Sequence, residues 1–379
     1  MLTVRLKEKS SYTWTLFRGW RAFLRDDLNG RGAEAAVAGK GERIGWLDGL
    51  VVGTRDATVV IDPQSLDKVP DHARVLVSHA HADHTYGFRH KGVKQSTPET
   101  REIHDALNSF GIGKFEQVKI GDRVVVEDIE VEALNAGHML GSAQFLAHTP
   151  FSTVLYTGDI NCIDTLTTKA AEPQECDMLV IEATYGSPTY RFPRREQVYS
   201  EMVEWALYTI NQGILPIFHV YAAGKAQEVV KLFNLYTKIP VVVSPRLDGV
   251  NRAYTRSGHS LDWRVSTSHE GRELLEKGPC VYLTTPNQNG GTLELANRRI
   301  ARAYATGWAM YYWRGDAGFP LSSHADFDQL VSYIKECNPK HVYVFTGFVD
   351  GIRRALSSAL GRETKLVPSF LQRTITEQY

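Results

Sequence analysis

Three histidines and an aspartate lie within six consecutive residues, His79, His81, Asp83 and His84, directly after the apolar run "ARVLV". Alternate side chains of an extended segment point in opposite directions, so these four cannot face one point. The run can instead serve two adjacent cations, with His79 and His81 directed at one and Asp83 and His84 at the other. Imidazole and carboxylate ligands suit zinc or manganese, and no nearby cysteine offers a thiolate for a structural zinc site. One loop supplies too few ligands for two ions, so the fold must bring others to it.

Single histidine or aspartate residues also follow other runs that we expect to be strands. His138 stands in "NAGHMLGSAQ", Asp159 in "LYTGDI" and Asp62 in "VVIDP". Their shared position at strand ends predicts a site on one edge of a sandwich of sheets. We expect Asp159 to bridge the two cations, and Asp62 to hydrogen-bond a ligand histidine and fix its tautomer. An isolated aspartate after a strand is more often a turn residue, so both interpretations depend on the histidine cluster.

Strand and helix signals divide the chain into parts. Short β-rich runs, mostly hairpin-like, extend to about residue 186 and predict sheet packed on sheet. Beyond this point helical and apolar runs alternate, as in "REQVYSEMVEWALYTINQG" followed by "ILPIFHVY", which is typical of βαβ units. We therefore expect an α+β protein with four parts: an N-terminal extension (1–41), a first sandwich part (42–190), an α/β insertion (191–316) and a C-terminal part that completes the sandwich (317–379). An aromatic and basic helix (12–24) in the extension is expected to pack on the sandwich, and contact with nucleic acid is its alternative role.

The bulk composition excludes few partners. Lysine plus arginine and aspartate plus glutamate balance at 43 residues each, so nucleic-acid binding would need a local patch rather than a global field. The four cysteines form no CxxC pair, which favours reduced thiols over a disulfide framework. No apolar run approaches the roughly 20 residues that span a bilayer, and the charged N-terminus lacks the apolar segment of a secretory signal. The expectation is a soluble cytoplasmic protein without a membrane partner.

Five motifs together resemble those of a known family. "SHAHADH", "NAGHMLGSAQ" and "LYTGDI" are similar to successive motifs of the metallo-β-lactamase fold. "IEATYGSPTY", with Glu182, and "LSSHADFDQL", with His324, resemble two further motifs of the beta-CASP nucleases. The resemblance implies a metallo-β-lactamase αββα sandwich with an inserted α/β beta-CASP cap domain. A thioesterase or a lactamase of the same fold is not expected to carry both the insertion and the "SSHAD" loop.

Within this family, the nearest likeness is to ligase-associated DNA exonucleases, through "SPTYRFP", "GKAQ" and "TGWAMYYWRG", and Artemis-type DNA repair nucleases share the "TGW". RNA-cleaving members are a more distant match. They are expected to have a histidine ligand of the second metal where this chain has Thr346. Artemis-type enzymes have an apolar residue there, so the departure favours DNA as substrate, although the ligase-associated group shares the histidine pattern. The departure predicts one tightly bound Zn²⁺ and a weaker second cation, with Mn²⁺ or Mg²⁺ as alternative metals. His341 is expected to lie too far away to replace that ligand, and Asp350 is the other candidate.

The resemblance implies hydrolysis of phosphodiester bonds, with Asp159, Glu182 and His324 in catalytic roles. Hydroxide held by the metal would be the nucleophile, since zinc lowers the pKa of its water to about 7. His324, oriented by Glu182, would protonate the leaving oxygen as a general acid. The other interpretation of His324 is a loop histidine whose ring is satisfied by backbone groups.

Basic and polar residues near these motifs are candidates for binding phosphates. They are Lys225, Arg191, Arg194, Arg195, Ser322 and Ser323, with a further group, Arg298, Arg299 and Arg302, expected on one helix of the cap. Arginines on a helix more often form a solvated face. The stretch "TTPNQNGGT" has the glycines and amide donors of an anion cradle at a helix start, but it lacks the lysine of a nucleotide-triphosphate loop.

These observations favour a metal-dependent DNA nuclease of the 5′ exonuclease type, in DNA repair or processing, with a DNA ligase or repair protein as partner. A ribonuclease in RNA 3′-end or 5′-end processing is the alternative. An inactive scaffold is expected to lose metal ligands that this chain retains. A metallo-hydrolase of small esters is a further candidate function, and it requires that the cap serve a purpose other than binding a polynucleotide.

Overall fold

The computed structural model describes residues 41–46, 48–286, 298–313, 315–359 and 366–368. The chain divides into two compact units, Met1–Ala36 and Val37–Tyr379, and the described residues all belong to the second. Residues 1–40 of the expected extension, with the helix at 12–24, lie outside the described residues, as does most of the expected anion cradle "TTPNQNGGT".

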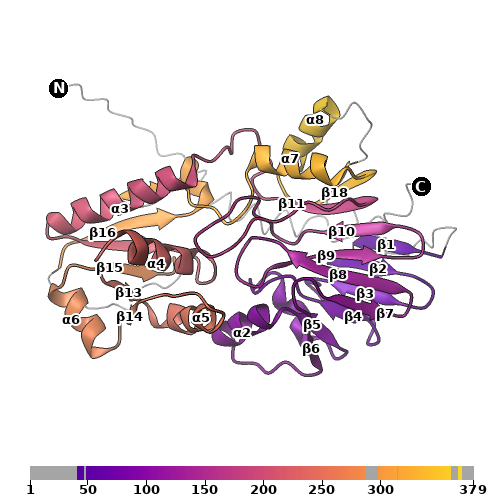
Figure 1. Cartoon of the computed structure of the whole chain (residues 1–379), viewed down its shortest axis with the longest axis horizontal. Coiled ribbons are helices and arrows are strands. Elements are labelled where there is room, and N and C mark those ends of the chain that lie inside the picture. Colours follow the sequence, from indigo (N-terminus) through magenta and orange to yellow (C-terminus); the bar gives the residue numbers. More distant parts are fainter. Residues whose placement is uncertain (1–40, 47, 287–297, 314, 360–365, 369–379) are drawn as a thin grey trace. The chain divides into compact units, whose positions relative to one another are not determined.

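Within the described residues, the strands form three sheets (Figure 1). The first sheet contains, in spatial order, β1 (Arg43–Trp46), β2 (Leu50–Gly53), β3 (Thr58–Ile61), β4 (Arg74–Leu76), β5 (Lys94–Ser96) and β6 (Phe115–Gln117). The second contains β19 (Leu366–Pro368), β18 (His341–Gly347), β11 (Met178–Ala183), β10 (Thr153–Tyr156), β9 (Ala143–His148), β8 (Ile129–Asn135) and β7 (Arg123–Val126). The third contains β14 (Arg264–Val265), β13 (Val241–Val243), β15 (Val281–Thr284), β12 (Leu215–His219), β16 (Ile300–Ala305) and β17 (Ala317–Phe319).

The helices connect these strands and cover the sheets. They are η1 (Thr85–Arg89), α2 (Pro98–Leu107), α3 (Arg195–Asn211), α4 (Lys225–Tyr236), α5 (Pro245–Arg256), α6 (His269–Lys277), η2 (Gly307–Met310), α7 (Phe327–Cys337) and α8 (Val349–Ala359).

The first two sheets pack face to face around a common core. In β10, Val154 and Tyr156 enter the cluster between the sheets, whereas Leu155 enters a second cluster on the outer face. β11 repeats the pattern, with Val180 inside and Leu179 outside. Because successive side chains of a strand point to opposite faces, the second sheet needs a cover on its outer face as well.

Helices provide that cover on both sides of the sandwich. α7 and α8 pack apolar side chains into the outer cluster of the second sheet. On the first sheet, η1 lies against β4, since a Cβ on Gly87 would come within 2.8 Å of Val75 Cγ1. Phe88 of η1 contacts His104 of α2, with ring centroids 4.7 Å apart. The described residues therefore form the αββα sandwich that the resemblance implied.

The third sheet is parallel throughout and forms the inserted α/β part. Its strand β13, "VVV", is wholly buried, as a strand covered by helices on both faces must be. Met202 of α3 and Phe233 of α4 pack on one face, and Leu275 of α6 belongs to the cluster on the other. The predicted alternation of strand and helix is confirmed. β17, which begins in the expected C-terminal part, pairs with β16, so this sheet continues three residues past the expected boundary at 316.

The expected hairpin-like pairing before residue 186 is found from β1 to β3 and from β7 to β10, where sequential strands pair antiparallel. It fails from β3 to β6 and between β10 and β11, which pair in parallel. Parallel neighbours need crossover connections, and the ligand loop with η1 and the segment with α2 serve as such connections. Arg302 lies in strand β16 rather than on a cap helix, and Arg298 and Arg299 directly precede that strand.

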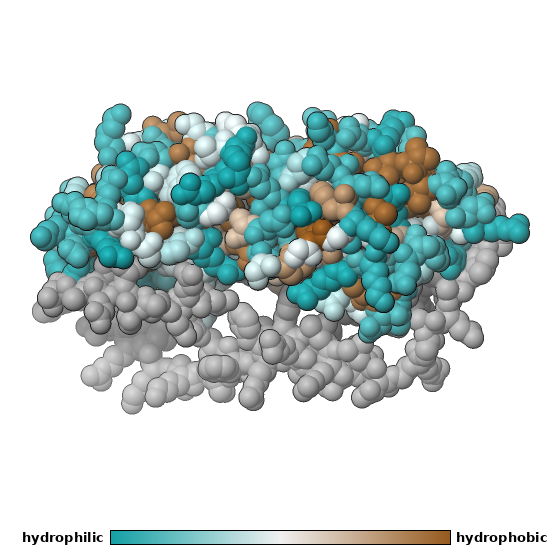
Figure 2. All heavy atoms as spheres, turned by 90° about the horizontal axis from the view of Figure 1, so that it is seen from below, coloured by the Kyte–Doolittle hydropathy of each residue, from teal (hydrophilic) through white to brown (hydrophobic). Residues whose placement is uncertain are grey.

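The face drawn in Figure 2 is mostly hydrophilic where it is coloured, and hydrophobic residues gather there in smaller groups. In the part of the chain that the structure describes, no helix has the length and the apolar character to cross a bilayer.

Candidate metal centre and proton donor

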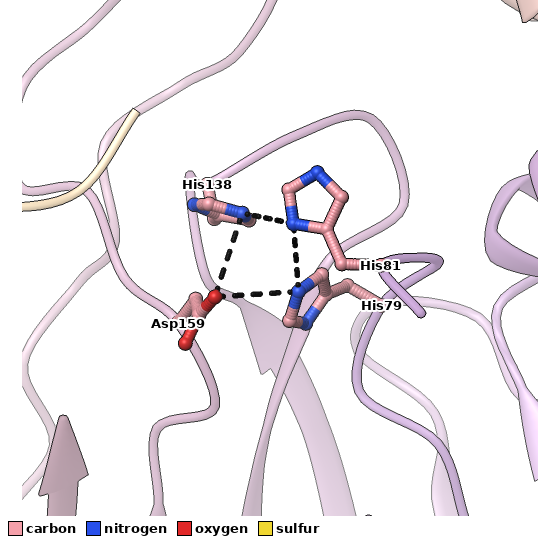
Figure 3. A group of neighbouring side chains, drawn as sticks. All are labelled: His79, His81, His138 and Asp159. Carbon is pink, nitrogen blue, oxygen red and sulfur yellow. Dashed lines mark hydrogen bonds and ion pairs between the residues drawn. The ribbon is translucent and has the colours of Figure 1, made fainter. Parts of the chain in front are cut away.

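The loops that follow β4, β8 and β10 bring the predicted ligands together at one edge of the sandwich (Figure 3). His79 and His81 come after β4, His138 after β8 and Asp159 after β10. β8 and β10 are both antiparallel to β9, which lies between them, so their carboxyl ends meet at the same edge. The convergence of these side chains is therefore a result of strand direction.

The four side chains in Figure 3 surround a single point. His81 Nδ1 lies 3.2 Å from His79 Nε2 and 3.1 Å from His138 Nε2. Asp159 Oδ2 lies 3.4 Å from His79 Nε2 and 3.7 Å from His138 Nε2. All four ligand atoms are within 4.8 Å of one another. Three imidazole nitrogens and a carboxylate oxygen at this spacing are a donor set that zinc binds in catalytic sites.

The outer nitrogens of the three rings determine which nitrogen can face a cation. His138 Nδ1 donates to the carbonyl oxygen of Ser323 at 2.8 Å, and His81 Nε2 donates to that of Ala223 at 3.4 Å. His79 Nδ1 pairs with the hydroxyl of Ser78 at 3.0 Å. A nitrogen that donates carries the ring proton, so the inner nitrogens of His138 and His81 present lone pairs. Lone pairs that converge at about 3 Å repel one another unless a cation lies between them, and the residues present therefore fit a bound metal.

Burial keeps these rings in the form that binds metals. It lowers the pKa of His81 to about 3, with the neighbouring His79 acting in the same direction. Burial also lowers the pKa of His138 well below its ordinary value, with His324 adding to the effect. Both imidazoles are neutral at pH 7, as a metal ligand must be.

A second group lies on the other side of Asp159. Oδ1 of Asp159 is 3.6 Å from His84 Nε2, and Asp83 Oδ2 is 3.8 Å from the same nitrogen. Asp159 thus directs one oxygen at each group, which is the arrangement expected of a bridging carboxylate. The side chain of Asp83 is 73% exposed, whereas His84 and Asp159 are buried. The second group is therefore the more open of the two.

Asp62 occupies the supporting position that the sequence predicted for it. Its Oδ2 accepts from His84 Nδ1 at 2.7 Å and from the Tyr156 hydroxyl at 3.0 Å, and its Oδ1 accepts from the backbone N–H of Ser78 at 2.7 Å. Although burial opposes it, Asp159 and Asp62 raise the pKa of His84 to about 10. A cation that binds Nε2 of His84 must therefore displace a proton.

Thr346 lies at the carboxyl end of β18, opposite Glu182 in the register of β11 and β18. His341 begins the same strand, and the five-residue step from His341 to Thr346 corresponds to roughly 17 Å of extended strand. Asp350, in α8, has a side chain that is 78% exposed and lies 3.1 Å from Arg353. His341 is thus too distant to replace the missing ligand, as expected, and Asp350 does not join the cluster.

His324 and Glu182 form a pair beside the metal ligands. His324 Nδ1 lies 2.8 Å from Glu182 Oε1, and Glu182 also accepts from the backbone N–H groups of Ile160 and Thr184 at 3.0 and 3.1 Å. Burial opposes the charged imidazole, but Glu182 raises the pKa of His324 above its ordinary value. Atoms of Asp159, Glu182 and His324 lie within 4.8 Å of one another. Because the ring of His324 pairs with a carboxylate, it is not a loop histidine whose ring is hydrogen-bonded by backbone groups alone.

Arg195, a predicted phosphate contact, is already engaged by groups within the protein. Its guanidinium is buried, donates to Glu228 at 2.8 Å from Nε and reaches the carbonyl oxygen of Ser322 at 2.7 and 2.9 Å from its two terminal nitrogens. Tyr199 also donates to Glu228. Sequence reasoning missed Glu228, although a glutamate on the apolar face of "GKAQEVV" is a signal for a buried partner. The pair joins α3 and α4 of the cap to the loop that carries His324.

The other predicted phosphate contacts differ in accessibility. Arg194 has a side chain that is 88% exposed, and Arg191 is also exposed but pairs with Asp328 at 2.6 Å. Lys225 is buried, with its Nζ 4.8 Å from the centroid of the Tyr221 ring.

The remaining candidates have structural partners. The Ser322 hydroxyl donates to the carbonyl oxygen of His324 and accepts from its N–H, both at 3.0 Å, and the carbonyl of Ser323 is used by His138. Both serine side chains are buried. Arg298 donates to three carbonyls at the end of α6, and Arg299 to the carbonyl of Gln212 after α3. These two arginines therefore stabilise helix ends.

No family model matches the chain. A protein of Opitutus terrae named "Probable DNA ligase" is 27% identical over 311 residues, which cover 77% of this chain and 29% of the ligase. The "RNase J-like protein" of Methanocaldococcus jannaschii is 27% identical, with 76% of this chain and 84% of the relative covered. "Cleavage and polyadenylation specificity factor subunit 3" of Dictyostelium discoideum is 24% identical, with 78% of this chain and 48% of the relative covered. This chain thus spans less than a third of the first relative and about half of the third.

One solved structure, described as a protein of unknown function from Enterococcus faecalis, superposes with a TM-score of 0.63 at 14% identity. The superposition covers 88% of this chain and all of that one. At this identity the likeness concerns the fold alone.

Proposed function

The chain belongs to the beta-CASP family of metallo-β-lactamase-fold nucleases, and we propose that it is a metal-dependent DNA nuclease of the 5′ exonuclease type. One observation supports hydrolysis of phosphodiesters above all others. Asp159 belongs both to the three-histidine cluster and to the group with Glu182 and His324, so a cation site and a proton donor adjoin the same carboxylate. Phosphodiester hydrolysis needs both, because charge on the phosphate must be neutralised and the leaving oxygen must be protonated.

A divalent cation held by His79, His81, His138 and Asp159 would supply an activated water and neutralise charge on the scissile phosphate. The chain's own residues supply the remaining parts. Nδ1 of His324 is engaged by Glu182, which leaves Nε2 as the atom that gives its proton to the leaving oxygen. Glu182 is held by two backbone N–H groups, so it fixes the orientation of the ring.

Substrate contacts can be proposed beside His324. A cavity of about 490 Å³ adjoins this residue, and its lining includes Asn161, Phe192, Arg194 and Ser322. Arg194, with its exposed guanidinium, is suited to a phosphate of the bound strand, and Lys225 is the proposed cation on the cap side. Arg195, Ser322 and Ser323 are buried, and the guanidinium and the two serine carbonyl oxygens have partners within the protein, so the proposed phosphate contacts do not include them.

The preference for DNA, and for DNA repair or processing, rests on two observations. The alignment with the relative named a DNA ligase covers 77% of this chain. Thr346 stands where RNA-cleaving members are expected to have a histidine. A DNA ligase is accordingly the proposed partner. RNA is the second candidate substrate, because two of the three relatives carry names that refer to RNA cleavage or polyadenylation.

Labelled single-stranded DNA and RNA of equal sequence, incubated with Zn²⁺ or Mn²⁺, test this proposal. We expect DNA to be cleaved faster, with products that shorten from the 5′ end. Cleavage of RNA alone would contradict the DNA assignment, and cleavage of neither would contradict the function.

His324→Ala should lower kcat by about 10²- to 10⁴-fold with its metal content unchanged, because only the proton donor is removed. His81→Ala should lose both metal and activity.

A further inference from the structure

Aromatic side chains gather on the surface near His324. Tyr311 is 60% exposed, Phe348 41% and Trp308 37%. Tyr190 lies between them, with its ring centroid 5.5 Å from each of the rings of Trp308, Tyr311 and Phe348. These four residues are called the aromatic platform below. Large aromatic rings usually bury most of their area, so a contiguous group with this exposure indicates a binding surface.

Tyr185 joins the platform to the proton donor. Its buried ring lies 6.0 Å from that of His324, 4.8 Å from that of Trp308 and 5.1 Å from that of Tyr190, between centroids. Only one ring therefore separates the platform from the residue proposed to protonate the leaving oxygen. A strand whose scissile phosphate lies beside His324 can place its neighbouring nucleotides on the platform.

The backbone beneath the platform fixes the rings in position. A Cβ on Gly307 would come within 2.5 Å of Cζ and the hydroxyl of Tyr185, so glycine is needed for η2 to carry Trp308 against Tyr185. The Tyr311 hydroxyl donates to the carbonyl oxygen of Thr189 at 2.5 Å. Rings held in this way lose little conformational freedom when a ligand binds.

Two arginines next to the platform are already paired. Arg191, which follows Tyr190, lies 2.6 Å from Asp328, and Arg353 lies 3.1 Å from Asp350. The platform therefore offers flat apolar faces rather than a field that attracts phosphates. Every nucleobase has such a face, and aromatic side chains are the usual stacking surface for unpaired bases.

We propose that the aromatic platform stacks unpaired bases of a single-stranded nucleic acid whose scissile phosphate lies at the His324 site. The inference rests on the proposed function and adds that the strand is engaged as a single strand, by its bases, next to the point of cleavage. Duplex DNA, whose bases are stacked on one another, cannot use the platform without local melting.

The test is binding of a short fluorescent oligothymidylate to the full, metal-loaded chain, followed by anisotropy. Phosphorothioate linkages slow its hydrolysis, and a matched strand with abasic sugars carries the same charge without bases. Stacking on one aromatic ring corresponds to roughly a fivefold or greater change in affinity. We expect Tyr311→Ala and Phe348→Ala each to weaken binding of the oligothymidylate by about this factor. Neither variant should change binding of the abasic strand.

Two kinds of control separate stacking from damage to the fold. Phe348→Tyr keeps the ring and should bind as the parent does, and Tyr311→Phe, which keeps the ring but loses the hydrogen bond to Thr189, should bind more tightly than Tyr311→Ala. Tyr208→Ala removes a ring on α3 that is 67% exposed and outside the platform, and should leave affinity unchanged. Because stacking is not ionic, the loss caused by Phe348→Ala should persist when the salt concentration is raised.

The outcomes distinguish this inference from the proposed function, since cleavage by the parent is measured separately. If the parent cleaves DNA but both alanine variants bind the oligothymidylate as tightly as it does, the platform is not a base-stacking site and the nuclease assignment stands. Equal loss of affinity for the abasic strand would also overturn the inference. If the variants change self-association on size exclusion but not oligonucleotide binding, the platform is a protein interface instead. If the parent neither binds nor cleaves nucleic acid, both proposals are wrong.

Discussion

Lys225 combines a positive charge with a buried position at the start of α4. Burial lowers its pKa to about 8, although Glu228 opposes the shift. The ammonium is therefore present at pH 7 and is lost as the pH rises through about 8. An arginine in its place would stay protonated over this whole range.

Oligonucleotide binding should report this titration if Lys225 contacts a phosphate. We expect the affinity of the parent to fall several-fold between about pH 7 and pH 9, because the neutral amine no longer attracts the phosphate. Lys225→Arg should bind with little change over the same interval. Anisotropy titrations at several pH values measure both. A parent whose affinity does not change with pH would remove Lys225 from the phosphate contacts.

At the scale of elements, the buried pair Arg195 and Glu228 ties α3 and α4 to the loop before α7. Arg195 holds the carbonyl of Ser322, and His138 holds the carbonyl of the next residue, Ser323. The backbone just before His324 is thus fixed from the cap and from the metal ligands together.

Arg195→Ala should lower the free energy of unfolding by about 3 kcal/mol, because it leaves the buried carboxylate of Glu228 without its cationic partner and with only the Tyr199 hydroxyl as a donor. Arg194→Ala is the matched control. The side chain of Arg194 is exposed, so its removal should change the free energy of unfolding by no more than about 0.5 kcal/mol. Urea unfolding followed by circular dichroism compares the two. Equal stabilities for both variants would show that the network contributes little.

At the scale of the whole molecule, the candidate metal centre connects parts that are distant in sequence. His81 comes from the first sheet and donates to Ala223, just before α4 of the cap, and His138 comes from the second sheet and donates to the loop before α7. A cation that binds these rings binds only the folded chain and must stabilise it.

Removal of metal should therefore lower the melting temperature of the parent. A cation at 100 times its Kd contributes about 2.7 kcal/mol, which corresponds to a shift of several degrees. His81→Ala should no longer respond to a chelator or to added Zn²⁺. His72→Ala, which changes an exposed histidine on the loop before β4, should respond as the parent does. Thermal scans with and without chelator check this, and an unchanged parent would argue against a resident cation.

Local spacing was sufficient to find the centre of the site. The ligands His79, His81, His138 and Asp159 each follow an apolar run, and the direction of a strand decides at which edge its final loop lies. Periods of two and of 3.6 residues also predicted packed sheets followed by βαβ units, whereas the αββα arrangement and the cap were implied by the resemblance to a family. His324 and Glu182 were found by likeness to a family rather than by spacing.

Partners far apart in sequence could only be identified in the folded chain. Arg195 looked like a surface cation until its partners, 33 and 127 residues away, proved to be Glu228 and the carbonyl of Ser322. Tyr190, Trp308 and Phe348 are far apart in the sequence and form one surface because Tyr190 and Trp308 pack on Tyr185 and Phe348 packs on Tyr190. The sequence determined which chemical groups stand at the ends of strands, because that depends on local backbone geometry. The tertiary structure decided which charges are paired and which rings are exposed, because burial depends on contacts between distant segments.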